Sequence, residues 1–137
     1  MSEIEETILE KAQAVFREVP YIKLLGMQLD ALKQGEAILS LKMRDELRQP
    51  QGFLHGGATA SIIDTATAFA VITVLEQDEK ATTVDLTVHY LRPVVEGTIT
   101  CTAKVVRAGR RLLTVSAEVF NEEGKLIATA LSTYSKI

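Results

Sequence analysis

The sequence has little of what several protein classes require. Its 137 residues include one cysteine, two histidines and no tryptophan, and only 5% are aromatic. A lone Cys101 excludes an internal disulfide and a cysteine-built zinc site. His55 and His89 are too far apart in the sequence to form a recognisable zinc pattern. We therefore expect neither a metal nor a cofactor.

Strong charge and a targeting segment are missing as well. The net charge is −3, whereas nucleic-acid binders need a basic face with aromatic stacking platforms. The N-terminus shows no basic and then apolar signal sequence. Residues 53–75 could span a bilayer in length, but several hydroxyl side chains and Asp64 interrupt them and acidic residues follow. We expect a cytoplasmic protein that binds neither nucleic acid nor membranes.

The same stretch, residues 53–75, is the most distinctive part of the chain. Its residues are apolar or small on every side, which predicts a helix that is buried all round. Asp64 is the only ionisable side chain between His55 and Glu76. A carboxylate inside a buried helix is costly unless it is paired or takes part in chemistry. Asp64 is therefore either a structural hydrogen-bonding group or a functional acid.

Shorter elements surround this helix. A capping-box pattern at Ser2–Glu5 and apolar residues at helical spacing predict an amphipathic helix that ends at Pro20. Two strands, or one bent strand, are expected over residues 26–32 and 36–43. Period-2 alternation predicts four more, joined as antiparallel hairpins, over residues 84–90, 99–105, 113–119 and 126–133.

These elements predict an α+β fold with one domain over residues 1–137. One antiparallel sheet with a single apolar helix buries that helix best by curling around it. The outer face and the edges of such a sheet need cover, so we expect a homo-oligomer.

One motif connects this layout to a known family. The motif reads Gln49-Pro-Gln-Gly52-Phe-Leu-His55-Gly56-Gly57, with an acid, Asp64, seven residues further on. This spacing and the order of elements resemble the PaaI-like (phenylacetate-degradation) branch of the hotdog-fold thioesterases. The resemblance extends to Pro20-Tyr21, to Tyr90-Leu-Arg92-Pro93 and to Gly109-Arg110. It implies a long central helix wrapped by a curved antiparallel sheet of five to six strands, with a short N-terminal helix.

The resemblance also implies an activity, the hydrolysis of an aryl- or medium-chain acyl-CoA. It further implies a dimer, or a dimer of dimers, with active sites between subunits. Gln49, His55 and Gly57 of one chain would then face Asp64 of the partner subunit.

In this family pattern Asp64 is the nucleophile or the general base, and the residues leave both open. The Gly57 N–H, at the helix start, would polarise the thioester carbonyl. Gln49 would orient the water or the thioester, and His55 would polarise the carbonyl or hold the loop. A hydroxyl on the strand after the helix would assist Asp64, with Thr83 as first choice and Thr82 as second.

The CoA arm carries phosphates and needs cations and close backbone approach. Gly56 has no side chain and allows that approach. Arg110 and Arg111, which match the Gly-Arg turn of the family, and also Arg92 are the candidate phosphate contacts that the resemblance implies. As simpler alternatives, His55 caps the helix, the glycines serve a tight helix entry, and Arg110-Arg111 is a solvated turn.

Two other functions fit the same residues. One is a hotdog hydratase or dehydratase acting on acyl-CoA or acyl-carrier protein, which also uses an acid and a histidine. The other is a non-catalytic acyl-CoA-binding protein that has the same pocket.

Overall fold

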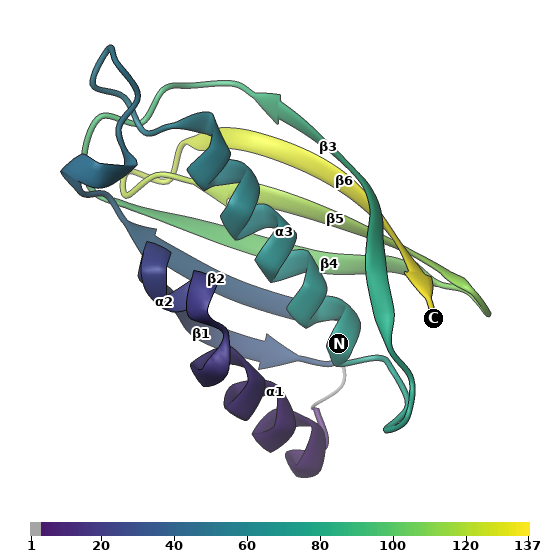
Figure 1. Cartoon of the computed structure of the whole chain (residues 1–137). Coiled ribbons are helices and arrows are strands. Elements are labelled where there is room, and N and C mark those ends of the chain that lie inside the picture. Colours follow the sequence, from purple (N-terminus) through teal and green to yellow (C-terminus); the bar gives the residue numbers. More distant parts are fainter. Residues whose placement is uncertain (1–3) are drawn as a thin grey trace.

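A curved sheet wraps one apolar helix (Figure 1). The computed structural model describes residues 4–137. The helices are α1 (Glu6–Glu18), α2 (Pro20–Leu25) and α3 (Gly56–Ile72), with a single 3-10 turn, η1 (Asp45–Leu47). The strands are β1 (Met27–Lys33), β2 (Glu36–Lys42), β3 (Ala81–Tyr90), β4 (Thr98–Ala108), β5 (Leu112–Phe120) and β6 (Leu126–Lys136). The predicted α+β hotdog architecture is confirmed.

The six strands form one antiparallel sheet in the order β1-β2-β4-β5-β6-β3. Alternation buries one face of the central strands, as Ile99, Cys101 and Ala103 of β4 show. The expected hairpin between residues 84–90 and 99–105 is wrong. β3 pairs with β6, and residues 91–97 carry the chain across to β4, which lies between β2 and β5. β3 is consequently an edge strand.

α3 lies against the concave face of the sheet. Ile62, Ile63 and Ala66 are fully buried there, and Phe69 packs edge-on against Phe16 of α1 with ring centroids 5.4 Å apart. The expectation that this helix is buried on every side is wrong for the single chain. One strip of α3 stays partly exposed, and Asp64 lies on it, half-buried.

The N-terminal segment differs from its prediction in two ways. Ile4 and Glu5 are not helical, and α1 begins at Glu6, whereas Ser2 of the expected capping box lies outside the described residues. Pro20 does not simply end the helical region. It occupies the first position of α2, where proline suits a helix, and α2 ends at Gly26 with a left-handed φ of 79°.

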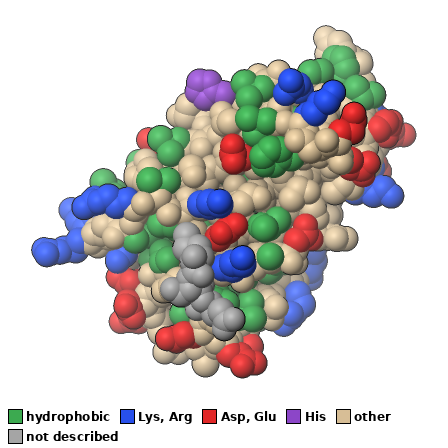
Figure 2. All heavy atoms as spheres, turned by 180° about the vertical axis from the view of Figure 1, so that it is seen from behind, with side chains coloured by type: hydrophobic (Ala, Val, Ile, Leu, Met, Phe, Trp, Pro, Cys, Tyr) green, Lys and Arg blue, Asp and Glu red, His purple; other side chains and the backbone are tan. Residues whose placement is uncertain are grey.

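The sheet's outer face, seen from behind in Figure 2, carries charges of both signs among small hydrophobic patches. Apolar side chains on β3 are among the most exposed: Val84 is 58% and Tyr90 55% exposed. Such a row on an edge strand is an unpartnered surface in the single chain. Within residues 4–137, none of the helices is both long and apolar enough to cross a bilayer.

Candidate active site

The loop before α3 explains the spacing of the glutamine motif. The Gly52 N–H donates to the Gln49 carbonyl at 2.9 Å, which closes a turn, and the Gln49 N–H donates to the Phe53 carbonyl at 2.8 Å. Gly52 has a φ of +91°, which an L side chain rarely adopts. The Gln49 side-chain oxygen accepts from the Gln51 N–H, so its NH₂ group remains available to a ligand.

Arg48 fixes this loop to the rest of the molecule. Its guanidinium donates to the carbonyls of Gly52 at 2.7 Å and Val95 at 2.8 Å. It also pairs with Asp45 at 3.0 Å and Glu96 at 2.6 Å, and the hydrogen bonds that it donates to these two carboxylates raise the pKa of Arg48. The loop that carries Gln49 is therefore tied to the connection between β3 and β4.

At the start of α3, His55 is the N-cap residue. Its Nδ1 accepts a hydrogen bond from the Gly57 N–H at 2.8 Å. A Cβ at residue 57 would lie 2.9 Å from that nitrogen, so a side chain there would displace the imidazole from this position. Because Nδ1 accepts, the neutral ring carries its proton on Nε2. The Gly57 N–H, which is the predicted hydrogen-bond donor to the thioester carbonyl, is thus already bound to His55 in the single chain. The His55 Nε2–H is a second possible donor to that carbonyl.

A pocket of about 280 Å³ lies beside the helix start. Gln49, Gly56 and Arg92 line it together, so three predicted site residues meet there. Tyr90 forms part of the same wall, and its hydroxyl donates to the Gly56 carbonyl at 2.9 Å. A Cβ at residue 56 would stand 3.4 Å from the Tyr90 ring, a tight but tolerable contact.

Asp64 belongs to a second cluster, further along α3. The Thr83 hydroxyl donates to Asp64 Oδ1 at 3.0 Å, so the structure brings Thr83, and not Thr82, to the acid. The Tyr134 hydroxyl lies 2.9 Å from the Asp64 carbonyl oxygen and 3.4 Å from Oδ1. Among the described residues, only Oδ1 receives hydrogen bonds, and Oδ2 is left for a substrate or a water.

Tyr134 is a neighbour of Asp64 that the sequence did not predict. It is 2% exposed, and its hydroxyl also lies 2.8 Å from Thr67 Oγ1. Burial raises the pKa of Tyr134 to about 12, so the hydroxyl remains a donor throughout the ordinary pH range. The sequence does place Tyr134 on the same strand face as the small residues Ala128, Ala130 and Ser132. A tyrosine buried on that face needs a hydrogen-bond partner for its hydroxyl, which could have indicated a polar contact.

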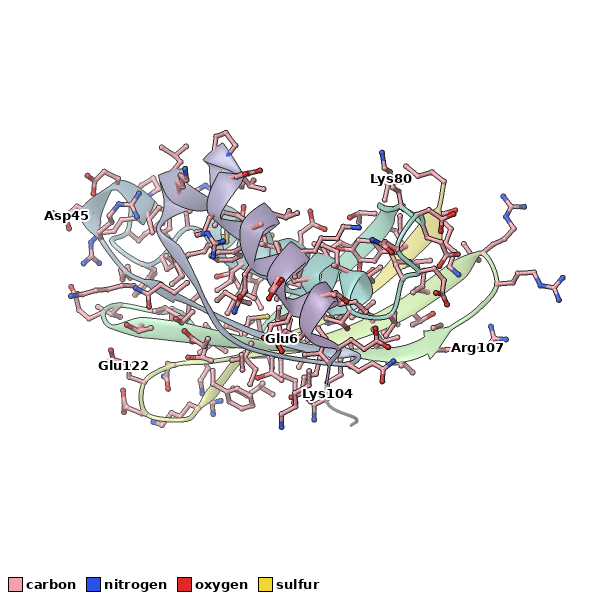
Figure 3. All side chains as sticks on the ribbon, turned by 90° about the horizontal axis from the view of Figure 1, so that it is seen from below. Glu6, Asp45, Lys80, Lys104, Arg107 and Glu122 are labelled. Carbon is pink, nitrogen blue, oxygen red and sulfur yellow. The ribbon has the colours of Figure 1, made fainter. Side chains whose placement is uncertain are left out.

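The predicted arginines divide between the two ends of the molecule. Arg92 lies at the pocket near the helix start, whereas Arg110 and Arg111 form the exposed β4–β5 turn. Figure 3 shows Arg107, just before that turn, at the opposite end from Asp45 of η1. Figure 2 shows basic side chains projecting from the same tip. Within one chain, Arg110 and Arg111 therefore cannot bind the same end of a ligand as the Gln49 loop does.

Distance also separates the two halves of the site within one chain. Gly57 and Asp64 are seven residues apart on α3, or about 10 Å along the helix axis. A hydrogen-bond donor to the thioester carbonyl must come within about 3 Å of the carbonyl oxygen. An attacking group must come within about 3.5 Å of the carbonyl carbon. Within one chain, the backbone at the helix start and the backbone at Asp64 are therefore further apart than either of these contact distances.

Other reactive groups are not available at this site. Cys101 is fully buried in β4, and burial raises the pKa of its thiol to about 12, so it is a core residue. In the part of the chain that the structure describes, no three His, Cys, Asp or Glu side chains gather as a metal site.

Comparison with known proteins agrees with this architecture. The model of the thioesterase superfamily matches residues 51–128. The medium/long-chain acyl-CoA thioesterase YigI of Escherichia coli is 31% identical, over 85% of this chain and 84% of its own length. The structure of the E. coli PaaI protein, from the phenylacetic acid degradation operon, is 25% identical with a TM-score of 0.91, over 98% of this chain and 96% of that one. A thioesterase structure from Haemophilus influenzae is also 25% identical, with a TM-score of 0.89, over 100% of this chain and 95% of that one.

The match to the family model includes His55, both glycines, Asp64 and Thr83. The fold and the matched range define a hotdog-fold hydrolase. The chain belongs to the thioesterase superfamily, and within it to the PaaI-like hotdog thioesterases. It is therefore a thioester hydrolase.

Proposed function

We propose that the chain hydrolyses acyl-CoA thioesters to free CoA and a carboxylic acid, with Asp64 as the reacting group. The observation that carries this proposal is the environment of Asp64. The Thr83 hydroxyl donates to Oδ1 at 3.0 Å and the Tyr134 hydroxyl lies 3.4 Å from it, while Asp64 itself lies on the partly exposed strip of α3. A positioned carboxylate with one free oxygen suits either a base or a nucleophile.

Both routes use the same carboxylate and balance in the same way. As a base, Asp64 takes a proton from water, the oxygen of that water attacks the carbonyl carbon, and the C–S bond breaks. The sulfur leaves as a thiolate and takes up the proton. As a nucleophile, Asp64 attacks the carbon itself, expels the thiolate and forms an anhydride, which water then hydrolyses.

The carbonyl oxygen is polarised from a helix start, where backbone N–H groups and the helix dipole favour developing negative charge. Two donors are available there, the His55 Nε2–H and, if the imidazole turns away, the Gly57 N–H. Gln49 lines the pocket next to the helix start, and its NH₂ group is a further candidate donor. Removal of one such donor typically costs about 10²–10³ in kcat.

Two observations support an acyl-CoA substrate: the name of a relative and the positions of three arginines. YigI carries the name of a medium/long-chain acyl-CoA thioesterase, and an aliphatic or aryl acyl-CoA suits this chain as well. Arg92 beside the pocket, with Arg110 and Arg111 at the β4–β5 tip, are cations for the phosphates of CoA.

We further propose that the site is completed by a second copy of the chain, related by two-fold symmetry. A two-fold axis pairs the helix start of one chain with Asp64 of the partner subunit, and the reverse, which yields two equal sites. The distance of about 10 Å along α3 within one chain and the exposed edge strand β3 support this dimer.

Asp64→Asn tests the assignment, because it keeps the shape of the side chain and removes its charge. We expect thiol release from a panel of aryl- and fatty-acyl-CoAs to fall by at least about 10²-fold. The melting temperature and the binding of a non-hydrolysable CoA thioether should change little. Asp30→Asn, at an exposed position of β1, is the matched control and should keep the parent rate.

Turnover of Asp64→Asn at the parent rate would contradict the role of the acid. If the parent protein hydrates crotonyl-CoA without releasing thiol, it is a hydratase instead. Tight binding of acyl-CoAs with no reaction would identify a binding protein.

A further inference from the structure

Tyr90 ends β3 close to the start of α3 (Figure 1). Its Cα pairs with that of Ala128 in β6, and the next residue, Leu91, donates its N–H to the Ile127 carbonyl at 2.8 Å. The β3–β6 ladder thus fixes the backbone that carries the Tyr90 side chain. The side chain reaches the first residue of α3, Gly56, whose carbonyl accepts a hydrogen bond from the Tyr90 hydroxyl at 2.9 Å.

Glycine at residue 56 lets the aromatic ring lie close to the helix start. A Cβ there would stand 3.4 Å from Tyr90 Cε1 and Cζ and 3.5 Å from its hydroxyl oxygen. Tyr90 is 55% exposed in the single chain, and among the described residues its hydroxyl has no hydrogen-bond partner other than this carbonyl. The hydroxyl therefore acts on a single backbone group.

The carbonyl that Tyr90 binds belongs to the same peptide as the Gly57 N–H. One planar, resonance-stabilised unit holds the Gly56 carbonyl at one end and the Gly57 N–H at the other. A hydrogen bond to the carbonyl draws electron density toward its oxygen, which makes the N–H a stronger donor. It also limits rotation of the peptide plane and so fixes the direction in which the N–H points. Tyr90 therefore acts on a group that the proposed mechanism uses.

The effect continues into the imidazole of His55. The Gly57 N–H donates to His55 Nδ1 at 2.8 Å, which leaves the ring proton on Nε2. A donor at Nδ1 withdraws electron density from the ring and strengthens the Nε2–H as a donor. The Tyr90 hydroxyl, the Gly56–Gly57 peptide and the imidazole thus form one chain of hydrogen bonds that all run in the same direction. The Tyr90 hydroxyl lies at one end of this chain whether the Gly57 N–H or the His55 Nε2–H meets the thioester.

We propose that Tyr90 is a positioning residue for the thioesterase reaction. Its hydroxyl orients and polarises the Gly56–Gly57 peptide, and through this peptide it strengthens the donors that receive the thioester carbonyl. This inference rests on the proposed function, and it adds a residue that acts through the helix start instead of on the thioester itself.

The expected size of the effect follows from the two contributions. A donor to the developing oxyanion is worth about 10²–10³ in kcat. A hydrogen bond within a chain is strengthened by about 10–30% through its neighbour. Loss of the Tyr90 hydroxyl should therefore lower kcat by about two- to eightfold. KM should stay nearly unchanged, because the substrate loses no contact.

Tyr90→Phe tests the proposal, because it removes the hydroxyl and keeps the ring over Gly56. Tyr21→Phe is the matched control. Tyr21 is 51% exposed, and its hydroxyl bonds to the Ser61 side chain at 2.7 Å instead of to a backbone carbonyl. Each variant loses one hydroxyl at the surface, so both melting temperatures should stay close to that of the parent.

The first measurement uses no substrate. In isotope-labelled protein, the chemical shift of the Gly57 amide proton reports the strength of its hydrogen bond to His55. We expect this resonance to move upfield in Tyr90→Phe, because the bond weakens, and to keep its position in Tyr21→Phe. The second measurement is steady-state thiol release from hexanoyl-CoA and benzoyl-CoA, in which kcat should fall in Tyr90→Phe alone.

A Gly57 resonance that does not move in Tyr90→Phe, or a kcat no lower than that of Tyr21→Phe, would overturn the role of Tyr90. Thiol release by the parent protein separates this failure from failure of the proposed function. If the parent releases no thiol but the resonance moves as expected, the hydrolysis is refuted and the chain of hydrogen bonds stands. If the parent releases thiol and Tyr90→Phe matches it in both measurements, the role of Tyr90 alone is refuted.

Discussion

The Gly57 N–H and the His55 Nδ1 stand 2.8 Å apart, and this one hydrogen bond decides which protons the helix start can offer. It satisfies one of the free N–H groups of the first turn of α3. It also leaves the His55 Nε2–H pointing away from that bond. The simpler reading of His55 as a helix cap is thus realised, and the cap also defines which ring nitrogen can act on a carbonyl.

Tyr134→Phe removes only the hydroxyl beside Asp64. We expect kcat to fall about tenfold with KM nearly unchanged, because the acid loses a donor that fixes it while the substrate loses no contact. The free energy of unfolding should fall by about 1–2 kcal/mol, since the Thr67 hydroxyl and the Asp64 carbonyl lose a buried partner. Steady-state kinetics and urea unfolding measure the two effects.

Ser132→Ala is the control for Tyr134→Phe. Ser132 is fully buried two residues earlier on β6, and its hydroxyl donates to the Asp85 carbonyl at 2.9 Å instead of approaching Asp64. It should lose similar stability and keep its kcat. If both variants lose kcat in proportion to stability, Tyr134 has only a structural role.

At the scale of elements, the loop over residues 48–54 places Gln49 by turn geometry. Gly52→Ala puts a side chain at a φ of +91° with no atom of another residue close to it, so the cost is backbone strain alone. We expect a loss of about 1–2 kcal/mol in stability and a fall of about tenfold in kcat/KM as Gln49 shifts. Thermal unfolding and steady-state kinetics test this.

Gly124→Ala matches that change elsewhere. Gly124 has a φ of +80°, also has no atom within 4 Å of its Cβ position, and lies in the β5–β6 turn. Equal loss of stability with full kcat/KM is the expected control result. A Gly52→Ala protein that retains the parent kcat/KM would show that the position of Gln49 does not matter.

Elements differ in how far the sequence predicts them. Alternation identified the four strands after α3, whereas the sequence left open whether β1 and β2 are two strands or one bent strand. Glycines 35, 109 and 124 lie in three of the connections. Alternation could not show that β3 leaves its neighbour in sequence to pair with β6, because pairing partners depend on contacts far along the chain. Helix α2 was missed because Pro20 signals the end of one helix and the start of another equally well.

The candidate site was predictable to the extent that it is encoded locally. The spacing from Gln49 to Gly57 follows from one turn and one helix cap, which short-range hydrogen bonds fix. The contact between Tyr134 and Asp64 joins residues 70 positions apart and depends on the curvature of the sheet. Thr83 was chosen correctly over Thr82 as the neighbour of Asp64 only through the family pattern, because period-2 alternation alone does not decide between two adjacent threonines.

At the scale of the whole molecule, a single chain leaves an acid on a partly exposed strip, a donor set about 10 Å away and an edge strand with uncovered apolar residues. A two-fold dimer would resolve all three features, because it covers the strip and brings the two half-sites together. We therefore expect catalysis to need Asp64 from one chain and the helix start from the other.

Complementation between two inactive variants tests that claim most directly. Asp64→Asn and the double variant Gln49→Ala with His55→Ala are co-expressed with different tags, and the mixed dimers are purified over both tags. Each mixed dimer holds one intact site if the sites form between chains, so thiol release should return to about half the parent rate per dimer. Mixed dimers as inactive as either variant alone would contradict the account.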